Sequence, residues 1–246
     1  MMKLFVKSLR TGVVTSKVSS PGGQPEWYRG YPEVDAARCQ GCGECAVACP
    51  TGAITVAGPG ADQWRLSVTR CLGCGACEEA CPARNIRCRG DFAGREVWAH
   101  ASQGGRRKAR SLHIRHLDGG SCNACDWEMV ALTNPVYDVQ RLGFDFVASP
   151  RHADALMVTG AVTRNLEEAV VKTYEATPVP KLVIAVGTCA CSGGLFTAGY
   201  ASAGGVKRVL PVDVYIPGCP PTPDAMIQGL CQAMAIYPNT SRKSLP

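Results

Sequence analysis

The chain has 246 residues, of which 46% are hydrophobic and 19% are charged. This composition excludes a disordered or collagen-like chain, and the length favours two modest domains over one large one. No stretch reaches the ~20 consecutive apolar residues of a membrane-spanning helix, and Lys7 interrupts the apolar start, so we expect neither a membrane span nor a secretory signal.

Cysteine is the unusual component, with fifteen residues in a chain whose formal net charge is +6. Without a secretory signal we expect a reducing compartment, which disfavours disulfides, and an odd number of cysteines cannot pair completely. The thiols therefore indicate metal or redox chemistry. The positive charge by itself would suit a nucleic-acid partner.

The first predicted element is a short amphipathic helix near the N-terminus. Its apolar side chains are Leu4, Phe5, Val6, Leu9 and Val13, set against basic residues such as Lys3, Lys7 and Arg10. A Pro/Gly-rich loop follows at residues 21–25. We interpret the helix as a docking element, which packs either within the molecule or on a membrane subunit or bilayer surface.

Residues 39–82 contain one cysteine pattern twice, with an offset of 32 residues. Each copy reads C-x2-C-x2-C-x3-C-P, the spacing of two-cluster bacterial ferredoxins, in which the fourth cysteine binds the other run's cluster. Between the copies, alternating residues at 53–56 and 64–68 predict a hairpin. The predicted ligands are Cys39, Cys42, Cys45 and Cys81 for the first 4Fe-4S cluster, and Cys71, Cys74, Cys77 and Cys49 for the second. A pair of zinc sites is the alternative, although zinc favours two separated pairs of ligands.

The segment from Arg84 to His116 is strongly basic, with eight arginines and one lysine against two acidic residues. Its centre, residues 101–108, is polar and Gly-rich, which is typical of a linker. We therefore expect a two-cluster ferredoxin domain with its N-terminal amphipathic helix at 1–99, a basic linker at 100–112 and a second domain at 113–246.

After the linker, apolar runs alternate with helix-length polar segments, which predicts a parallel α/β sheet. The expected strands are residues 112–116, 144–148, 155–158, 182–186 and 212–216. Cys122, Cys125, Cys189 and Cys219 follow such runs, and the carboxyl ends of parallel strands are where these sheets build their sites. These four thiols predict a third cluster, with zinc again the alternative. Spacing alone leaves Cys191 as a competing ligand.

Four motifs in this half carry a family resemblance: GGSCNACD (119–126), ASPRHAD (148–154), GTCACSGG (187–194) and IPGCPP (216–221). They resemble the small subunit of membrane-bound, complex I-related NiFe hydrogenases of the formate hydrogenlyase type. Residues 1–99, including YRGYP at 28–32, resemble the companion two-cluster ferredoxin subunit, so the chain resembles a fusion of both. The resemblance implies an α+β ferredoxin-like two-cluster domain followed by an α/β flavodoxin-like parallel-sheet domain.

The resemblance also implies a set of ligands. It assigns the proximal cluster to Cys122, Cys125, Cys189 and Cys219, which leaves Cys191, Cys88 and Cys231 outside the ligand set. The cofactors are then three 4Fe-4S clusters, whose iron is bound through twelve cysteines, and no catalytic residue is assigned. Arg151 of the Ser-Pro-Arg motif is implied to lie near the cluster and tune it, with a simple salt bridge as the alternative.

The function that the resemblance implies is electron transfer within a multi-subunit oxidoreductase. The expected partners are a NiFe hydrogenase-like large subunit, membrane-embedded subunits, and a formate dehydrogenase, a carbon monoxide dehydrogenase or a soluble ferredoxin as electron donor. The expected location is the inner face of the cell membrane, as a peripheral subunit. C-x2-C in place of adjacent cysteines favours the hydrogenase branch. The alternatives are a complex I-like module that reduces quinone or another acceptor, and a free-standing electron carrier.

Binding of the clusters also changes the charge argument. Twelve thiolates and three oxidised cores together contribute about −6, which brings the protein with its clusters close to neutral. We therefore expect no nucleic-acid partner, and we interpret the basic segment as a solvated linker or as a docking surface for an acidic partner.

Overall fold

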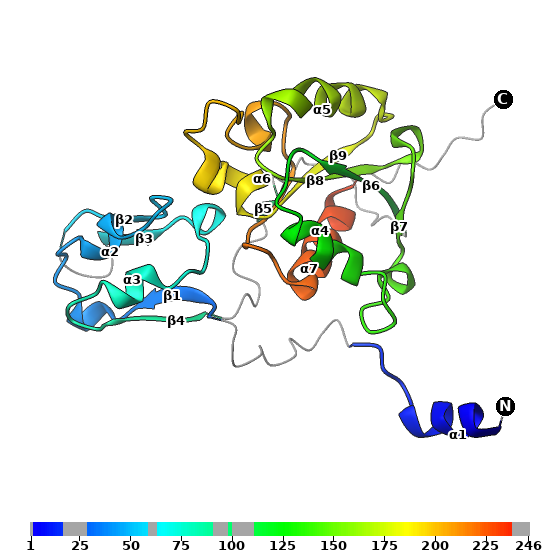
Figure 1. Cartoon of the computed structure of the whole chain (residues 1–246), viewed down its shortest axis with the longest axis horizontal. Coiled ribbons are helices and arrows are strands. Elements are labelled where there is room, and N and C mark those ends of the chain that lie inside the picture. Colours follow the sequence, from blue (N-terminus) through cyan, green and yellow to red (C-terminus); the bar gives the residue numbers. More distant parts are fainter. Residues whose placement is uncertain (1, 17–28, 59–62, 91–97, 100–110, 238–246) are drawn as a thin grey trace.

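The computed structural model describes residues 2–16, 29–58, 63–90, 98–99 and 111–237. The predicted loop at 21–25 lies outside these residues, as does the linker that we expected at 100–112 apart from its last two positions. The described residues form a smaller and a larger lobe (Figure 1). None of the helices in these ranges has the length and apolar character needed to cross a membrane.

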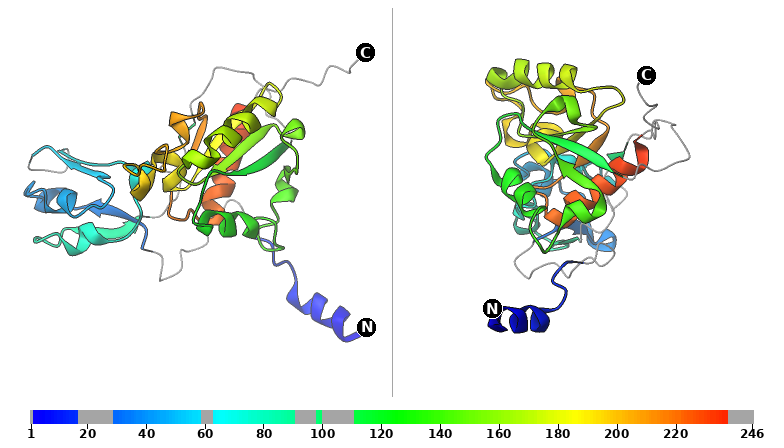
Figure 2. Two further views of the ribbon diagram at one scale, coloured as in Figure 1. Left: turned by 45° about the horizontal axis from the view of Figure 1, so that its top comes forward. Right: turned by 90° about the vertical axis from the view of Figure 1, so that its right-hand side faces the viewer.

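The N-terminal helix α1 (Met2–Thr11) confirms the helix predicted at this end, and it stands apart from both lobes (Figure 2). Its Leu4 and Leu9 side chains are exposed. The residues that follow contact the larger lobe, because the Ser16 N–H donates to the Val136 carbonyl at 2.7 Å. The segment after α1 therefore lies against the larger lobe, and the predicted domain bounds stay a prediction.

The smaller lobe contains two short antiparallel sheets, built from β1 with β4 and from β2 with β3. Its elements in chain order are β1 (Tyr31–Val34), η1 (Ala36–Arg38), α2 (Glu44–Val47), β2 (Ile54–Val56), β3 (Trp64–Leu66), η3 (Val68–Arg70), α3 (Ala76–Glu79) and β4 (Ile86–Gly90). Pairing of β2 with β3 confirms the predicted hairpin. Both α2 and α3 begin after a glycine with positive φ, Gly43 at 80° and Gly75 at 83°, a conformation that favours glycine.

The larger lobe is built on a six-stranded sheet of order β5-β10-β9-β8-β6-β7. Its strands are β5 (Trp98–Ala99), β6 (Leu112–Asp118), β7 (Phe144–Phe146), β8 (Ala155–Thr159), β9 (Leu182–Val186) and β10 (Val214–Ile216). All are parallel except β5, which pairs antiparallel with β10. The parallel strands have the flavodoxin-like order, which confirms the predicted fold class. The sheet also includes β5, which precedes the linker predicted from the sequence.

Helices cover both faces of this sheet and explain the apolar character of its strands (Figure 1). On one face α4 (Ala124–Ala131) and α7 (Pro223–Ile236) pack against residues such as Met157 and Ile184. On the other face α5 (Arg164–Ala176) and α6 (Thr188–Ser192) pack against Leu156 and Val183. Short turns complete the lobe: η4 (Val139–Leu142), η5 (Pro150–His152), η6 (Gly194–Phe196) and η7 (Val206–Arg208). Because β8 and β9 are buried on both faces, their residues do not alternate between apolar and polar, and all are apolar except Thr159 at the end of β8.

Candidate functional site

The first predicted quartet of cysteines surrounds one hollow of the smaller lobe. Cys39, Cys42, Cys45 and Cys81 line a space of about 390 Å³, together with Trp64 and Asn85. Cys45 and Cys81 are buried, whereas Cys42 is exposed. Three of these cysteines come from the first run and one from the second, so the fold brings together the set that the ferredoxin spacing predicts.

The second predicted quartet surrounds another hollow in the same lobe, of about 350 Å³. It is lined by Cys49, Cys71, Cys74 and Cys77, and by one further thiol, that of Cys88 on β4. The Cys88 thiol hydrogen-bonds to Cys77 and lowers its pKa to about 7. Burial raises the pKa of Cys71 to about 11. Cys88 was predicted to lie outside the ligand set, and the sequence contained no sign that it adjoins the second quartet.

The third predicted quartet lies where loops leave the carboxyl ends of β6, β9 and β10. Cys122 and Cys125 follow β6, Cys189 follows β9 and Cys219 follows β10. Burial and the neighbouring thiolates of Cys189, Cys219 and Cys122 raise the pKa of Cys125 to about 12. Cys122 and Cys219 are exposed, so this quartet opens to the surface of the lobe.

The three remaining cysteines have different surroundings. Cys191 lies on α6 with its side chain buried in the core, and its thiol donates to the Ala185 carbonyl at 3.5 Å. Cys88 lines the second hollow, and Cys231 is exposed on α7. Cys191 therefore points into the apolar core, whereas Cys189, two residues earlier, has Cys219 and Cys122 as its neighbours.

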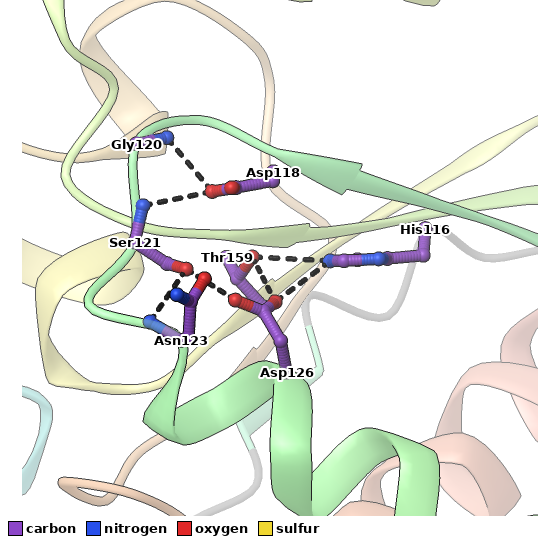
Figure 3. Close-up of polar contacts among 7 residues, drawn as sticks. All are labelled: His116, Asp118, Gly120, Ser121, Asn123, Asp126 and Thr159. Carbon is purple, nitrogen blue, oxygen red and sulfur yellow. Dashed lines mark hydrogen bonds and ion pairs between the residues drawn. The ribbon is translucent and has the colours of Figure 1, made fainter.

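Two aspartates hold the loop that carries Cys122 and Cys125 (Figure 3). The Asp118 carboxylate, at the end of β6, accepts from the Gly120 N–H at 2.9 Å and the Ser121 N–H at 2.7 Å. The Ser121 hydroxyl in turn accepts from the Asn123 N–H at 3.0 Å and donates to the Asp126 carboxylate. These hydrogen bonds therefore fix the path of the loop between β6 and α4.

Asp126, the residue after Cys125, is itself held in place by two side chains of the sheet. Its carboxylate accepts from the Thr159 hydroxyl at 2.8 Å and pairs with His116 Nε2 at 2.9 Å (Figure 3). We assigned no role to His116 or Asp126 from the sequence. The sequence offered little signal for this pair, because β6 (LHIRHLD) is polar at four of its seven positions and His116 does not stand out among them.

The second and third quartets adjoin each other across the two lobes. The hydroxyl of Thr188, the residue before Cys189, donates to the Cys71 carbonyl at 2.9 Å and to the Gly218 carbonyl at 3.1 Å. Thr188 is only 1% exposed. Cys74 also contributes to raising the pKa of Cys219, after burial and Cys122. One buried side chain therefore joins a cysteine of the second quartet to the loops of the third.

The donor sets fit iron–sulfur clusters better than single zinc ions. All fifteen cysteines are free. Each of the two hollows of the smaller lobe is lined by four cysteines with the spacing of two-cluster ferredoxins, whereas zinc favours two separated pairs of ligands. The indole nitrogen of Trp64 is buried beside the first hollow without a hydrogen-bond partner, and cluster sulfur is an acceptor that such a donor lacks.

Arg151 lies on the turn η5 between β7 and β8, and its side chain is exposed. In the part of the chain that the structure describes, no hydrogen bond or ion pair joins its guanidinium to any of the twelve predicted ligands. Its backbone N–H contacts the Ser149 hydroxyl at 3.4 Å. A tuning role for Arg151 stays a prediction.

Two protein families match different parts of the chain. Residues 38–85 match the 4Fe-4S dicluster domain, and residues 122–233 match the NADH ubiquinone oxidoreductase 20 kDa subunit. These matches coincide with the first two quartets and with the third quartet, respectively.

Individual relatives come from hydrogenases and from respiratory complexes. The chain is 44% identical over 127 residues to formate hydrogenlyase subunit 7 of Escherichia coli, covering 52% of this chain and 50% of that subunit. It is 46% identical to the probable membrane-bound hydrogenase subunit mbhJ of Pyrococcus furiosus, covering 51% and 75%. It is 42% identical to an NADH-quinone oxidoreductase subunit of Heliobacterium modesticaldum, covering 56% and 78%. The match thus spans half of the Escherichia coli protein and about three quarters of the other two.

Proposed function

Because the chain belongs to the family of the NADH ubiquinone oxidoreductase 20 kDa subunit and also contains a 4Fe-4S dicluster domain, we propose that it holds three 4Fe-4S clusters in series. Members of the family are iron–sulfur electron-transfer subunits of hydrogenase and complex I-type oxidoreductases. When bound, each cluster supplies one-electron chemistry that protein side chains lack. This chain would then serve as an internal wire of such a complex.

The proposed ligands are the twelve cysteines of the three quartets. Cys39, Cys42, Cys45 and Cys81 would hold the first cluster, Cys49, Cys71, Cys74 and Cys77 the second, and Cys122, Cys125, Cys189 and Cys219 the third. Fifteen unpaired thiols satisfy the ligand requirement, and the raised pKa of Cys125 and Cys189 means that binding there releases protons.

The contact between the second and third quartets is the observation that carries the proposal. Thr188 links the Cys71 carbonyl to the loop of Cys189 without a solvent layer between them. Tethering in one chain also replaces a docking equilibrium between separate subunits by a high effective concentration. Along the path of electron transfer, the clusters would follow the order of the first, second and third quartets.

The surface beside the third quartet supports a protein partner at this end of the wire. Cys122 and Cys219 are exposed there. On α4, the helix that carries Cys125, Trp127 is 73% exposed and Val130 is 61% exposed, and this apolar surface suits an interface. We propose that a NiFe hydrogenase-like large subunit covers this surface, and that membrane-embedded subunits hold the complex peripherally at the inner face of the membrane.

A complex I-like module that reduces quinone or another acceptor is the second candidate, favoured by the match to the NADH-quinone oxidoreductase of Heliobacterium modesticaldum. Formate dehydrogenase, carbon monoxide dehydrogenase and soluble ferredoxin are the candidate electron donors.

The nickel and iron content of the complex separates the two candidate functions. The complex is purified through this chain under anaerobic conditions in mild detergent. Nickel near one per chain with about 13 iron atoms supports the hydrogenase assignment. About 12 iron atoms without nickel contradicts it and favours the second candidate.

A further inference from the structure

Trp64 occupies a special position in the first hollow. It lies on β3, paired in register with Val56 of β2, and its side chain lines the space surrounded by Cys39, Cys42, Cys45 and Cys81. Its indole nitrogen is buried and has no hydrogen-bond partner. A buried donor without a partner costs free energy, so such groups in native proteins generally have an acceptor.

The side chains that line this hollow together with Trp64 include all four cysteines of the first quartet, so sulfur surrounds the space that the indole borders. The indole N–H is a donor only, so it needs an acceptor in the hollow. The Asn85 side-chain oxygen in the same lining accepts from the Cys81 thiol at 2.7 Å, and the indole has no partner among the described residues, so a thiolate bound to iron or a sulfide of a cluster would supply its acceptor.

We infer that the Trp64 indole N–H donates a hydrogen bond to sulfur of the first cluster or of its cysteine ligands and raises the reduction potential of that cluster. The inference rests on the proposed function, because it requires a cluster in the first quartet. Reduction adds negative charge to the cluster sulfurs, so a donated hydrogen bond stabilises the reduced form more than the oxidised form. Trp64 would then act directly on the first cluster, and it distinguishes two sites with the same cysteine spacing.

The internal repeat makes this distinction specific. The lining of the second hollow contains no tryptophan among the described residues, and its hydrogen-bonding side chains include the Cys88 thiol and the Thr51 hydroxyl, which lies 3.7 Å from Cys49 Sγ. The position equivalent to Cys88 in the first half is Val56, the register partner of Trp64. The two sites therefore differ in the donors that face their sulfurs while they share the C-x2-C-x2-C-x3-C pattern.

The test is a redox titration of the full chain with its clusters, followed by electron paramagnetic resonance. Trp64→Phe keeps an aromatic ring and removes the N–H. We expect about a tenfold change in the ratio of oxidised to reduced first cluster at a fixed potential, a shift of 59 mV to lower potential for one electron, with the other clusters unchanged. Tyr200→Phe is the control, because it also removes a donor from an aromatic ring, on a side chain of the larger lobe that is 98% exposed, and it leaves the first potential unaltered. An unchanged first potential in Trp64→Phe overturns the inference.

A second measurement does not depend on a folded variant. Wild-type protein labelled with ¹⁵N at the tryptophan indole is reduced, and hyperfine coupling between the label and the first cluster is sought. Coupling supports the inference, and its absence overturns it. Failure of the proposed function is distinct, because wild-type protein would then bind fewer than three clusters before any variant is compared.

Discussion

Replacing Thr188 by valine tests the junction between the second and third quartets. Valine has nearly the same shape as threonine but removes the hydroxyl that donates to the Cys71 and Gly218 carbonyls. The Gly218 carbonyl still accepts the Thr188 N–H at 2.8 Å. The Cys71 carbonyl loses the hydrogen bond that joins the lobes, so one buried acceptor is left unsatisfied at a cost of about 1–3 kcal/mol. That free energy corresponds to a fall of about 5- to 150-fold in the equilibrium ratio of joined to separated lobes.

The assay is the magnetic interaction between the reduced second and third clusters in the full chain, measured by electron paramagnetic resonance. We expect the interaction to weaken or to become heterogeneous in Thr188→Val. Thr197→Val is the matched control, because the Thr197 hydroxyl also donates to two carbonyls, those of Ser192 and Gly194 at 2.9 Å, within the larger lobe alone. It lowers the stability of that lobe but preserves the interaction. An interaction of wild-type strength in Thr188→Val would refute this reasoning.

Three further changes follow from the third quartet. A Cβ on Gly187 would lie 2.5 Å from Cys125 Sγ, at a backbone φ of +87° that disfavours alanine. We therefore expect the Gly187→Ala protein to contain about one third less iron, because the third cluster is lost and the first two remain. Full iron content would contradict this. Asp126→Ala removes the acceptor shared by Ser121, Thr159 and His116. We expect the free energy of unfolding of the cluster-free chain to fall by about 1–3 kcal/mol, measured by denaturant titration. An unchanged midpoint would count against the network. In the cluster-free chain, burial raises the pKa of Cys125 from 9.0 to about 12, so the stability that its protonated thiol contributes is complete below pH 9 and is lost as the pH rises toward 12. Thermal unfolding at pH 8 and pH 10.5 should therefore show a smaller fall for Cys125→Ser than for wild type, and equal falls would exclude this assignment.

Much of the fold follows from local patterns in the sequence. Strands such as β8 and β9 are continuous apolar runs because helices cover both of their faces, so their positions could be predicted from composition. The cysteine repeat likewise predicts which thiols share a hollow, because three close ligands come from one loop and the fourth, which directly precedes a proline, comes from the other run.

The parts that could not be predicted depend on contacts between residues distant in the chain. Thr188 meets Cys71 across 117 positions, and Asp126 meets Thr159 across 33. Neither contact has a periodic or spacing signal in one sequence. The two-residue strand β5 is also too short to show alternation, so its pairing with β10 was not foreseen.

The central claim is that this single chain holds three clusters. Its most direct test is the iron and acid-labile sulfide content of the purified full chain after anaerobic reconstitution, referred to protein concentration. The account predicts about 12 iron and about 12 sulfide per chain, falling to about 8 of each when the third quartet is removed by Cys122→Ser with Cys219→Ser. A wild-type content of about 8, unchanged by those substitutions, would contradict it.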